Sequence, residues 1–254
     1  MEIVQSRRLN SIPRLKHGFF LPGEERSLED NLSFKSAPRE TVMEARRRAC
    51  GFLEIPHENL THVYQEHGTG IWPVEQEHCG AGALTGDDQV GRGDALITQE
   101  ENLPLAILIA DCLPIFFSTS DAGVIGLAHA GWRGTFDEIA VKTVQRMHSE
   151  FAVDARDLNV WIGPGISVEG FTVGDDLWEK FKDRWGGYSD CFRDATTSID
   201  LKQLNRIQLE GAGVPPGSIE TSGDCTFCDR RFFSYRRDGK GSGHNMAVIM
   251  RDGR

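Results

Sequence analysis

The chain has 254 residues, of which 39% are hydrophobic, so it is long enough to bury a full hydrophobic core. Its net charge of -10 argues against a nucleic-acid-binding surface, because such surfaces are normally basic. No apolar run is long enough to span a membrane, and the N-terminus lacks the apolar segment of a secretory signal. We therefore expect a soluble, cytoplasmic protein with a single domain over residues 1–254 and with neither nucleic-acid nor membrane partners.

Apolar runs alternate with amphipathic stretches along the chain, and no internal repeat separates them. This alternation favours a single mixed α/β body. Helical spacing of apolar residues predicts a first helix over 40–53, with three consecutive arginines spread around the rest of its surface. Strands are predicted over 93–98, 104–117 and 123–129, and the turn-forming residues between the last two predict a hairpin.

Further elements follow His129. Thr135 and Glu138 fit the S/T-x-x-E capping box, so a helix is expected to begin at Thr135. The sequence then predicts a strand over 158–163 and a helix over 175–185, whose inward face is expected to comprise Leu177, Phe181 and Trp185.

The C-terminal part predicts one more helix and two strands. The helix covers 200–213 and ends at a glycine. Residues 230–239 and 244–251 alternate in a way typical of strands, and we expect them to flank a turn at Asp238-Gly239.

An acid and a thiol, Asp111 and Cys112, interrupt the most apolar run of the chain just before Pro114. An uncompensated carboxylate is costly in an apolar interior. Proline, which cannot donate to a sheet, tends to mark strand ends, edges or bulges. We therefore expect the strand to end at a polar site, with the Cys112 thiol facing a cleft.

Two histidines are candidate partners of Cys112. His129 follows the next strand, so the predicted hairpin would bring its imidazole near the thiol, and His67 lies in a glycine-containing stretch that can approach a crowded site. Two histidines and one cysteine suit catalytic zinc, because three protein ligands leave a fourth position open. Alternatively, Cys112 and His129 are a nucleophile and its base. Spacing alone also allows an ordinary core thiol and unrelated imidazoles.

Arg133 is a candidate anion-binding residue. It lies between two glycines, just before the helix that is predicted to begin at Thr135. Free backbone N–H groups, the positive end of the helix dipole and a guanidinium together form a good anion site. A capped helix with a solvated arginine is the structural alternative.

The six cysteines are expected to be reduced thiols or ligands, because they are too few and too scattered to staple a chain of this length. Cys225 and Cys228 form a C-x-x-C sequence. It has no second pair and no thioredoxin-like setting, which favours ordinary buried thiols.

Eight short motifs occur in the order found in a known family: HGTG at 67–70, GDALIT at 93–98, ADCLPI at 110–115, HAGWRG at 129–134, IGPGI at 162–166, FTVGDD at 171–176, CT at 225–226 and FFSYRRDG at 232–239. On these motifs the chain resembles the YfiH family, also called laccase-domain or polyphenol-oxidoreductase proteins and, in bacteria, the peptidoglycan editing factor. The resemblance covers nearly the whole chain, and ADCLP with HAGWRG is highly specific.

The resemblance implies that His67, Cys112 and His129 are metal ligands that bind zinc or copper. It implies phosphorolysis of the purine nucleosides adenosine, inosine and methylthioadenosine, with phosphate as the second substrate, and deamination of adenosine. The implied fold is a mixed α/β sandwich of β-sheet flanked by helices, similar to that of cysteine-dependent toxin deamidases. The chain departs from the family at Ala45, where asparagine is usual, and at 242–244, which reads SGH in place of TGR.

Several residues acquire candidate roles from this combination. Arg46 matches the arginine of an N-terminal family motif near the pocket, and Arg46 or Arg133 would supply the cation for phosphate. Asp111 is a candidate general acid or base if it faces the cleft, although as the strand neighbour of Cys112 it can point to the opposite side. Cys112 and His129 are the remaining catalytic candidates.

Other functions stay open at this point. The chain has eight histidines and no H-x-H pair, so one chain cannot supply the many imidazoles of a full multicopper centre. We rank nucleoside chemistry first, an amide-hydrolysing editor of peptidoglycan precursors second and copper-dependent polyphenol oxidation third. A non-enzymatic module with a structural metal is the remaining class. The sequence leaves the oligomeric state open.

Overall fold

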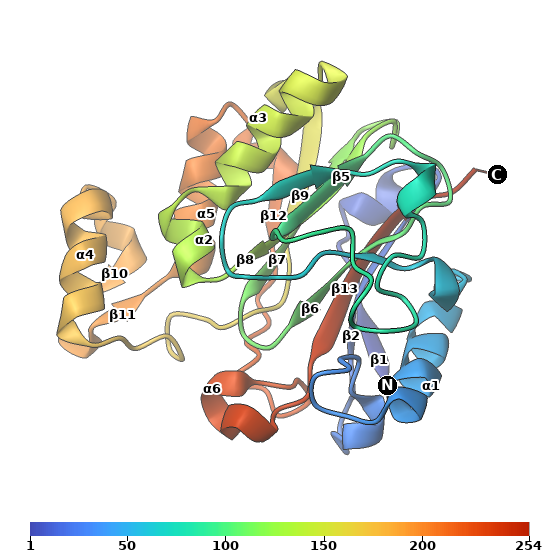
Figure 1. The fold of residues 1–254 in the computed structure, drawn as a ribbon. Coiled ribbons are helices and arrows are strands. Elements are labelled where there is room, and N and C mark those ends of the chain that lie inside the picture. The colour runs from blue at the N-terminus through green and yellow to red at the C-terminus, as the bar shows by residue number, and fades with distance from the viewer. Residues whose placement is uncertain (254) are drawn as a thin grey trace.

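The computed structural model describes residues 1–253, which form two β-sheets packed face to face between helices (Figure 1). One sheet has five strands in the order β1-β2-β13-β6-β3, and the other has six in the order β12-β9-β7-β8-β5-β4. Both combine parallel and antiparallel pairs. The predicted mixed α/β class is confirmed.

The five-stranded sheet draws on both ends of the chain. Its strands are β1 (Glu2–Val4), β2 (Leu15–Leu21), β13 (Asn245–Arg251), β6 (Leu105–Ile109) and β3 (Thr61–His62). Successive side chains of a strand point to opposite faces. In β13, Ala247 and Ile249 accordingly enter the core between the sheets, whereas Val248 packs toward α1 (Arg39–Gly51).

The middle of the chain forms the six-stranded sheet. Its strands are β12 (Ile219–Thr221), β9 (Leu158–Ile162), β7 (Leu113–Thr119), β8 (Ile125–Ala130), β5 (Ala95–Thr98) and β4 (Ile71–Pro73). β7 and β8 are antiparallel neighbours, which confirms the predicted hairpin. A separate two-stranded sheet consists of β10 (Phe192–Arg193) and β11 (Ser198–Ile199).

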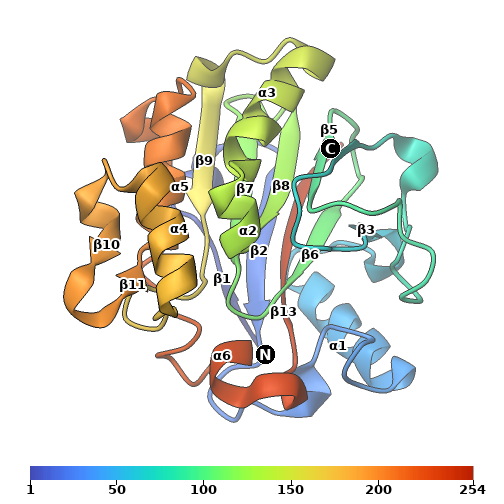
Figure 2. The same cartoon turned by 60° about the vertical axis from the view of Figure 1, so that its left-hand side comes forward.

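Helices cover the outer face of each sheet. In Figure 2, α2 (Trp132–Phe136) and α3 (Ile139–Phe151) lie over β7 and β8, and α5 (Leu201–Gly211) lies beside them, with α4 (Asp175–Trp185) nearby. α1 lies on the far side of the molecule (Figure 1). α6 (Tyr235–Asp238) is a single turn near the C-terminus. Within residues 1–253, no helix has the length and apolar character needed to cross a lipid bilayer.

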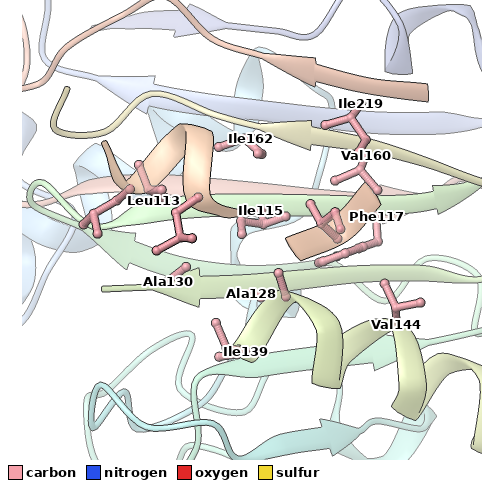
Figure 3. Packing of buried hydrophobic residues seen from close by; sticks show 14 of the residues in the cluster. Leu113, Ile115, Phe117, Ala128, Ala130, Ile139, Val144, Val160, Ile162 and Ile219 are labelled. Atoms are coloured by element: carbon pink, nitrogen blue, oxygen red, sulfur yellow. The ribbon is translucent and has the colours of Figure 1, made fainter. Parts of the chain in front are cut away.

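The core between α3 and the six-stranded sheet fixes the position of β7 and β8. Leu113, Ile115 and Phe117 alternate along β7 and are fully buried. Figure 3 shows them in one layer with Ile139 and Val144 of α3. Because both sheets are covered on both faces, their central strands are apolar throughout rather than alternating.

That double burial explains one wrong prediction. The apolar run 104–117 is not one strand: β6 ends at Ile109, and β7, which belongs to the other sheet, begins at Leu113. Asp111 lies at the crossing with a φ of 90°, a left-handed conformation that no strand residue adopts. The expectation that the strand ends at a polar site is confirmed, but Pro114 lies inside β7.

The predicted helix start at Thr135 is also wrong. The first helical turn, α2, begins at Trp132, and Glu138, with a φ of 63°, separates it from α3. The Thr135 hydroxyl accepts a hydrogen bond from Asn205 Nδ2 at 2.8 Å and caps no helix. Arg133 therefore lies within α2 rather than ahead of a long helix.

Only one of the two predicted C-terminal strands is present. Residues 245–251 form β13, as expected, but 230–239 form no strand. The Ser234 hydroxyl accepts the backbone N–H of Arg237 and caps α6, which ends at Asp238 and is followed by Gly239 with a φ of 66°. In α4 the bounds agree with the prediction, but Trp178 and Phe181 are its buried residues, whereas Leu177 and Trp185 are only partly buried.

Candidate functional site

Strand register brings distant residues together at one end of the six-stranded sheet. The pairing of β7 with β8 places Cys112, which precedes β7, beside Gly131, which follows β8. The pairing of β5 with β8 places Asp94, which precedes β5, beside His129. His67 arrives from the loop between β3 and β4 with a φ of 62°. The hairpin therefore does bring the predicted thiol and imidazole to one place.

His67, Cys112 and His129 form one compact group. Their potential ligand atoms all lie within 4.8 Å of one another, and the two imidazole rings meet edge to face with centroids 4.9 Å apart. His129 is buried, Cys112 is partly exposed and His67 is exposed. Within residues 1–253 no other group of three or more histidine, cysteine or acidic side chains is arranged to hold a metal ion.

Gly131 has no side chain, and this leaves space for Cys112 and His67 to approach each other. A Cβ atom at this position would lie 3.0 Å from Cys112 Sγ and 3.2 Å from His67 Cδ2. Any side chain would therefore press into the space between the two donors. The combination of two imidazoles, one thiol and a side-chain-free wall fits a zinc or copper ion, which favours nitrogen and sulfur ligands.

Asp94 is a site residue that the sequence analysis missed. Its side chain is fully buried, and Oδ1 lies 2.8 Å from His129 Nδ1. The carboxylate also accepts the backbone N–H groups of His67 at 3.0 Å and Gly68 at 2.6 Å. Asp94 thus orients His129 so that Nε2 faces the group, and it holds the His67 loop in place. The sequence signal was an acid near the start of the predicted strand 93–98, within the motif GDALIT.

The charges of this group reinforce one another. Burial alone would raise the pKa of the Cys112 thiol, but the charge and hydrogen bonds of His129 and His67 lower this pKa to about 6. Burial likewise opposes protonation of His129, yet Cys112 and Asp94 raise the His129 pKa to about 9. The site therefore favours a thiolate, which is the form of cysteine that binds metal or attacks an electrophile.

All six site residues predicted from the sequence line one pocket of about 540 Å³, a size suited to a small molecule. The pocket extends from the His67 group toward two further imidazoles, His62 and His244. Burial lowers the pKa of His62 well below its usual value and that of His244 to about 4, so both rings are neutral at pH 7. His62 Nε2 and His244 Nδ1 have no hydrogen-bond partner among residues 1–253.

Asp111 faces this pocket from the crossing between the sheets. Its carboxylate accepts the Thr226 hydroxyl at 2.7 Å and the Arg236 backbone N–H at 2.6 Å. These two bonds fix its orientation. The carboxylate is thus directed toward Thr226 and α6, and Cys112, its neighbour, is directed toward the histidines.

Arg46 is buried rather than spread over the outer surface of α1. Its guanidinium donates to the carbonyls of Leu32 at 3.1 Å, Gly82 at 2.9 Å and Ala83 at 2.8 Å. Burial lowers its pKa to about 10, which leaves it charged at neutral pH. These bonds tie the segments around Leu32 and Gly82 to α1, so Arg46 stabilises the pocket wall.

Arg133 lies at the pocket rim and is exposed. Its guanidinium stacks over the ring of Trp132 at 4.1 Å and donates to no hydrogen-bond acceptor within residues 1–253. The side chain is therefore available for an anion. α2 is too short to add a helix-dipole site of its own.

Fold and site together define a mixed α/β protein with a His–Cys–His group in a small-molecule pocket. The chain belongs to the family described as multi-copper polyphenol oxidoreductase laccase, which matches residues 25–252. It is 36% identical over 241 residues to the purine nucleoside phosphorylase YlmD of Geobacillus stearothermophilus, covering 93% of this chain and 88% of that protein.

Two further comparisons agree with this assignment. The chain is 34% identical over 218 residues to adenosine deaminase RL5 from an unknown prokaryote, covering 83% of this chain and 82% of RL5. The crystal structure of the hypothetical protein YfiH of Bacillus licheniformis matches with a TM-score of 0.86 at 29% identity, covering 93% of this chain and 92% of that structure. The resemblance to the YfiH family is confirmed.

Proposed function

We propose that this protein is a metal-dependent purine nucleoside phosphorylase that also deaminates adenosine. The observation that carries the proposal is the convergence of His67, Cys112 and His129 in a pocket with an unpaired guanidinium, Arg133, at its rim. The names of the relatives, a purine nucleoside phosphorylase and an adenosine deaminase, support the same substrate class.

The metal would be held by His67, Cys112 and His129, with zinc as the first choice and copper as the second. A bound ion would supply Lewis acidity next to the substrate. The chain's own contribution is to keep Cys112 as a thiolate and to hold one proton of His129 on Nδ1, against Asp94, so that Nε2 is the nitrogen that would give up its proton and bind the ion.

The remaining pocket residues would bind and orient the two substrates. Arg133 would hold phosphate through charge-assisted hydrogen bonds at the rim. The purine would lie against the neutral rings of His62 and His244, which line the pocket and carry no charge at pH 7. Asp111, with its carboxylate held by Thr226 and Arg236, is the candidate acid–base group. Phosphate would then attack C1′ as the bond to the base breaks.

A second candidate is amide hydrolysis of a peptidoglycan precursor. Asp94, His129 and Cys112 lie in the order orienting acid, base and nucleophile that cysteine hydrolases use. In that reaction Cys112 would attack the amide carbonyl, and His129 would protonate the leaving amine. Water would then hydrolyse the resulting thioester, which releases the acid and regenerates the Cys112 thiol. Because the same thiolate cannot be both metal ligand and nucleophile at once, the two functions predict opposite responses to a chelator.

Polyphenol oxidation ranks third, despite the family's description. A multicopper oxidase requires several clustered copper sites, whereas residues 1–253 hold one group suited to a metal. The pocket also contains a free cation, which a neutral phenol does not need.

Inosine is the substrate that tests the proposal, because it is already deaminated and its released base reports on the glycosidic bond alone. We expect metal-loaded protein to release hypoxanthine and ribose 1-phosphate only when phosphate is present. Release in plain buffer would indicate a nucleoside hydrolase. No release from inosine, adenosine or methylthioadenosine would transfer the assignment to the amide hydrolase.

Arg133→Ala is expected to raise the phosphate concentration needed for half-maximal phosphorolysis roughly tenfold, since a hydrogen bond to a charged group contributes about 1.5–3 kcal/mol. The KM for inosine should change little. Arg146→Ala is a matched control, because Arg146 is an exposed helical arginine paired with Glu150 away from the pocket. An unchanged phosphate dependence would make Arg133 a surface residue.

A further inference from the structure

Cys225 and Cys228 are placed as a pair on the loop before α6. Their Sγ atoms lie 3.0 Å apart, and the Asp229 backbone N–H donates to the Cys225 carbonyl at 2.9 Å, which closes a helix-like turn around them. Cys225 is buried but Cys228 is exposed. The expectation of two ordinary buried thiols is therefore wrong for Cys228.

The turn around Cys225 stabilises its thiolate. The backbone N–H groups of Cys228 and Ser167 point at Cys225 Sγ from 3.2 Å and 3.4 Å. Burial alone would raise the pKa of Cys225, but hydrogen bonds from Cys228 and Ser167 outweigh burial and lower it. By contrast, burial raises the pKa of Cys50 and of Cys191 to about 12, so these thiols are the least reactive.

We propose that Cys225 and Cys228 are a redox-active dithiol, which closes to an intrachain disulfide by exchange with a small disulfide such as glutathione disulfide. The two sulfurs need to approach by only about 1 Å to reach the S–S bond length of about 2.05 Å. Within residues 1–253 neither cysteine belongs to a group of three or more potential ligands, so the pair is a dithiol rather than part of a metal site.

The exchange takes two steps in a fixed order. Hydrogen bonding to Cys225 raises the pKa of Cys228, so Cys228, the accessible thiol, passes its proton to the neighbouring Cys225 thiolate as it attacks one sulfur of the small disulfide. This attack forms a mixed disulfide and releases the first small thiolate, which takes the proton back from Cys225. The Cys225 thiolate then attacks Cys228 Sγ and releases the second. The protein loses two electrons and two protons, and the small disulfide is reduced to two thiols.

A single hydrogen bond connects the Cys225–Cys228 loop to Asp111, which lines the pocket. Thr226, between the two cysteines, donates its hydroxyl to Asp111 Oδ1 at 2.7 Å. Arg237 of α6 donates to the carbonyls of Thr226 at 3.0 Å and Phe227 at 3.0 Å, which ties the same loop to α6. Closing the disulfide therefore changes a loop that fixes the orientation of the residue before Cys112.

The test equilibrates the metal-loaded full chain with glutathione disulfide, quenches it with acid, alkylates it under denaturing conditions with N-ethylmaleimide and digests it with trypsin. Residues 207–230 form one tryptic peptide containing both cysteines. We expect this peptide to lose both labels and to be two hydrogen atoms lighter than its reduced form. Excess reduced glutathione should restore both labels.

Cys225→Ser tests whether Cys225 resolves the mixed disulfide or whether Cys228 reacts only because it is exposed. In this variant Cys228 should accumulate as a stable mixed disulfide with glutathione. Cys79→Ser, at a half-buried loop thiol, should leave the oxidation of peptide 207–230 unchanged. Retention of both labels at every glutathione ratio would overturn the proposal. A wild-type peptide that keeps bound glutathione would overturn it too, because Cys225 would then not resolve the mixed disulfide.

Discussion

Cys112→Ser is expected to lose most of the metal bound to the protein, because a hydroxyl is a far poorer ligand for zinc or copper than a thiolate. Wild-type protein, analysed by elemental mass spectrometry after purification, should carry roughly one ion per chain if three ligands hold it. The loss should abolish phosphorolysis of inosine. The substitution itself should barely affect the stability of the metal-free chain, because the Cys112 side chain is partly exposed at a pocket wall.

Cys79→Ser is the matched control for this substitution, since Cys79 is absent from the pocket lining and its thiol donates to the Asn59 carbonyl at 3.7 Å at the edge of the hydrophobic core. Full metal content in Cys112→Ser would exclude Cys112 as a ligand. Alkylation gives an independent check: Cys112 should react slowly in the metal-loaded protein and rapidly after a chelator removes the ion. Rapid labelling with metal still bound would favour the cysteine hydrolase.

Asp94→Asn is expected to lower metal affinity by roughly 10–100-fold, the usual cost of losing the partner that orients a histidine ligand. The asparagine amide can present an N–H group to His129 Nδ1, which favours the wrong tautomer of the ring. Asparagine also offers one acceptor oxygen where the carboxylate serves several donors, including His67 and Gly68. Isothermal titration with zinc at 10 °C measures the affinity of folded protein.

Thermal unfolding of the same variant distinguishes positioning from folding. A buried donor left without its acceptor costs about 1–3 kcal/mol, so a lower Tm is expected for Asp94→Asn in any case. A purely structural role would lower the Tm and leave zinc affinity in the cold unchanged. Asp121→Asn, in the β7–β8 turn, removes a carboxylate that accepts from Thr119 and Gly123, and should leave metal affinity unchanged.

The parts of the fold that follow from local pattern could be predicted from the sequence. α4 and α5 agree with their predicted ranges to within two residues, because amphipathic spacing and the glycine after α5 are local signals. The β7–β8 hairpin was predicted for the same reason, since its turn residues lie between two apolar runs. That hairpin is what brings Cys112 and His129 together.

The remaining features depend on contacts between segments distant in sequence. Asp94 reaches His129 through the register of β5 on β8, which no local pattern reveals. The sequence predicts that a strand ends near Asp111. It does not predict that the chain crosses there to a second sheet, because the buried strands of both sheets are equally apolar. The alternating residues of 230–239 predict a strand, but the chain forms a helical turn there instead. Ser234 caps this turn.

The crossing at Asp111 also has a consequence for how the site is assembled as the chain folds. Cys112 is fixed only when β6 and β7 have entered their separate sheets and the sheets have packed against each other. His67 follows β3 and Asp94 precedes β5, and these strands pair with β6 and β8 over long sequence separations, which makes such contacts slow to form. A metal ion that selects this geometry would therefore bind the finished sandwich and stabilise it as a whole by mass action, rather than nucleate it.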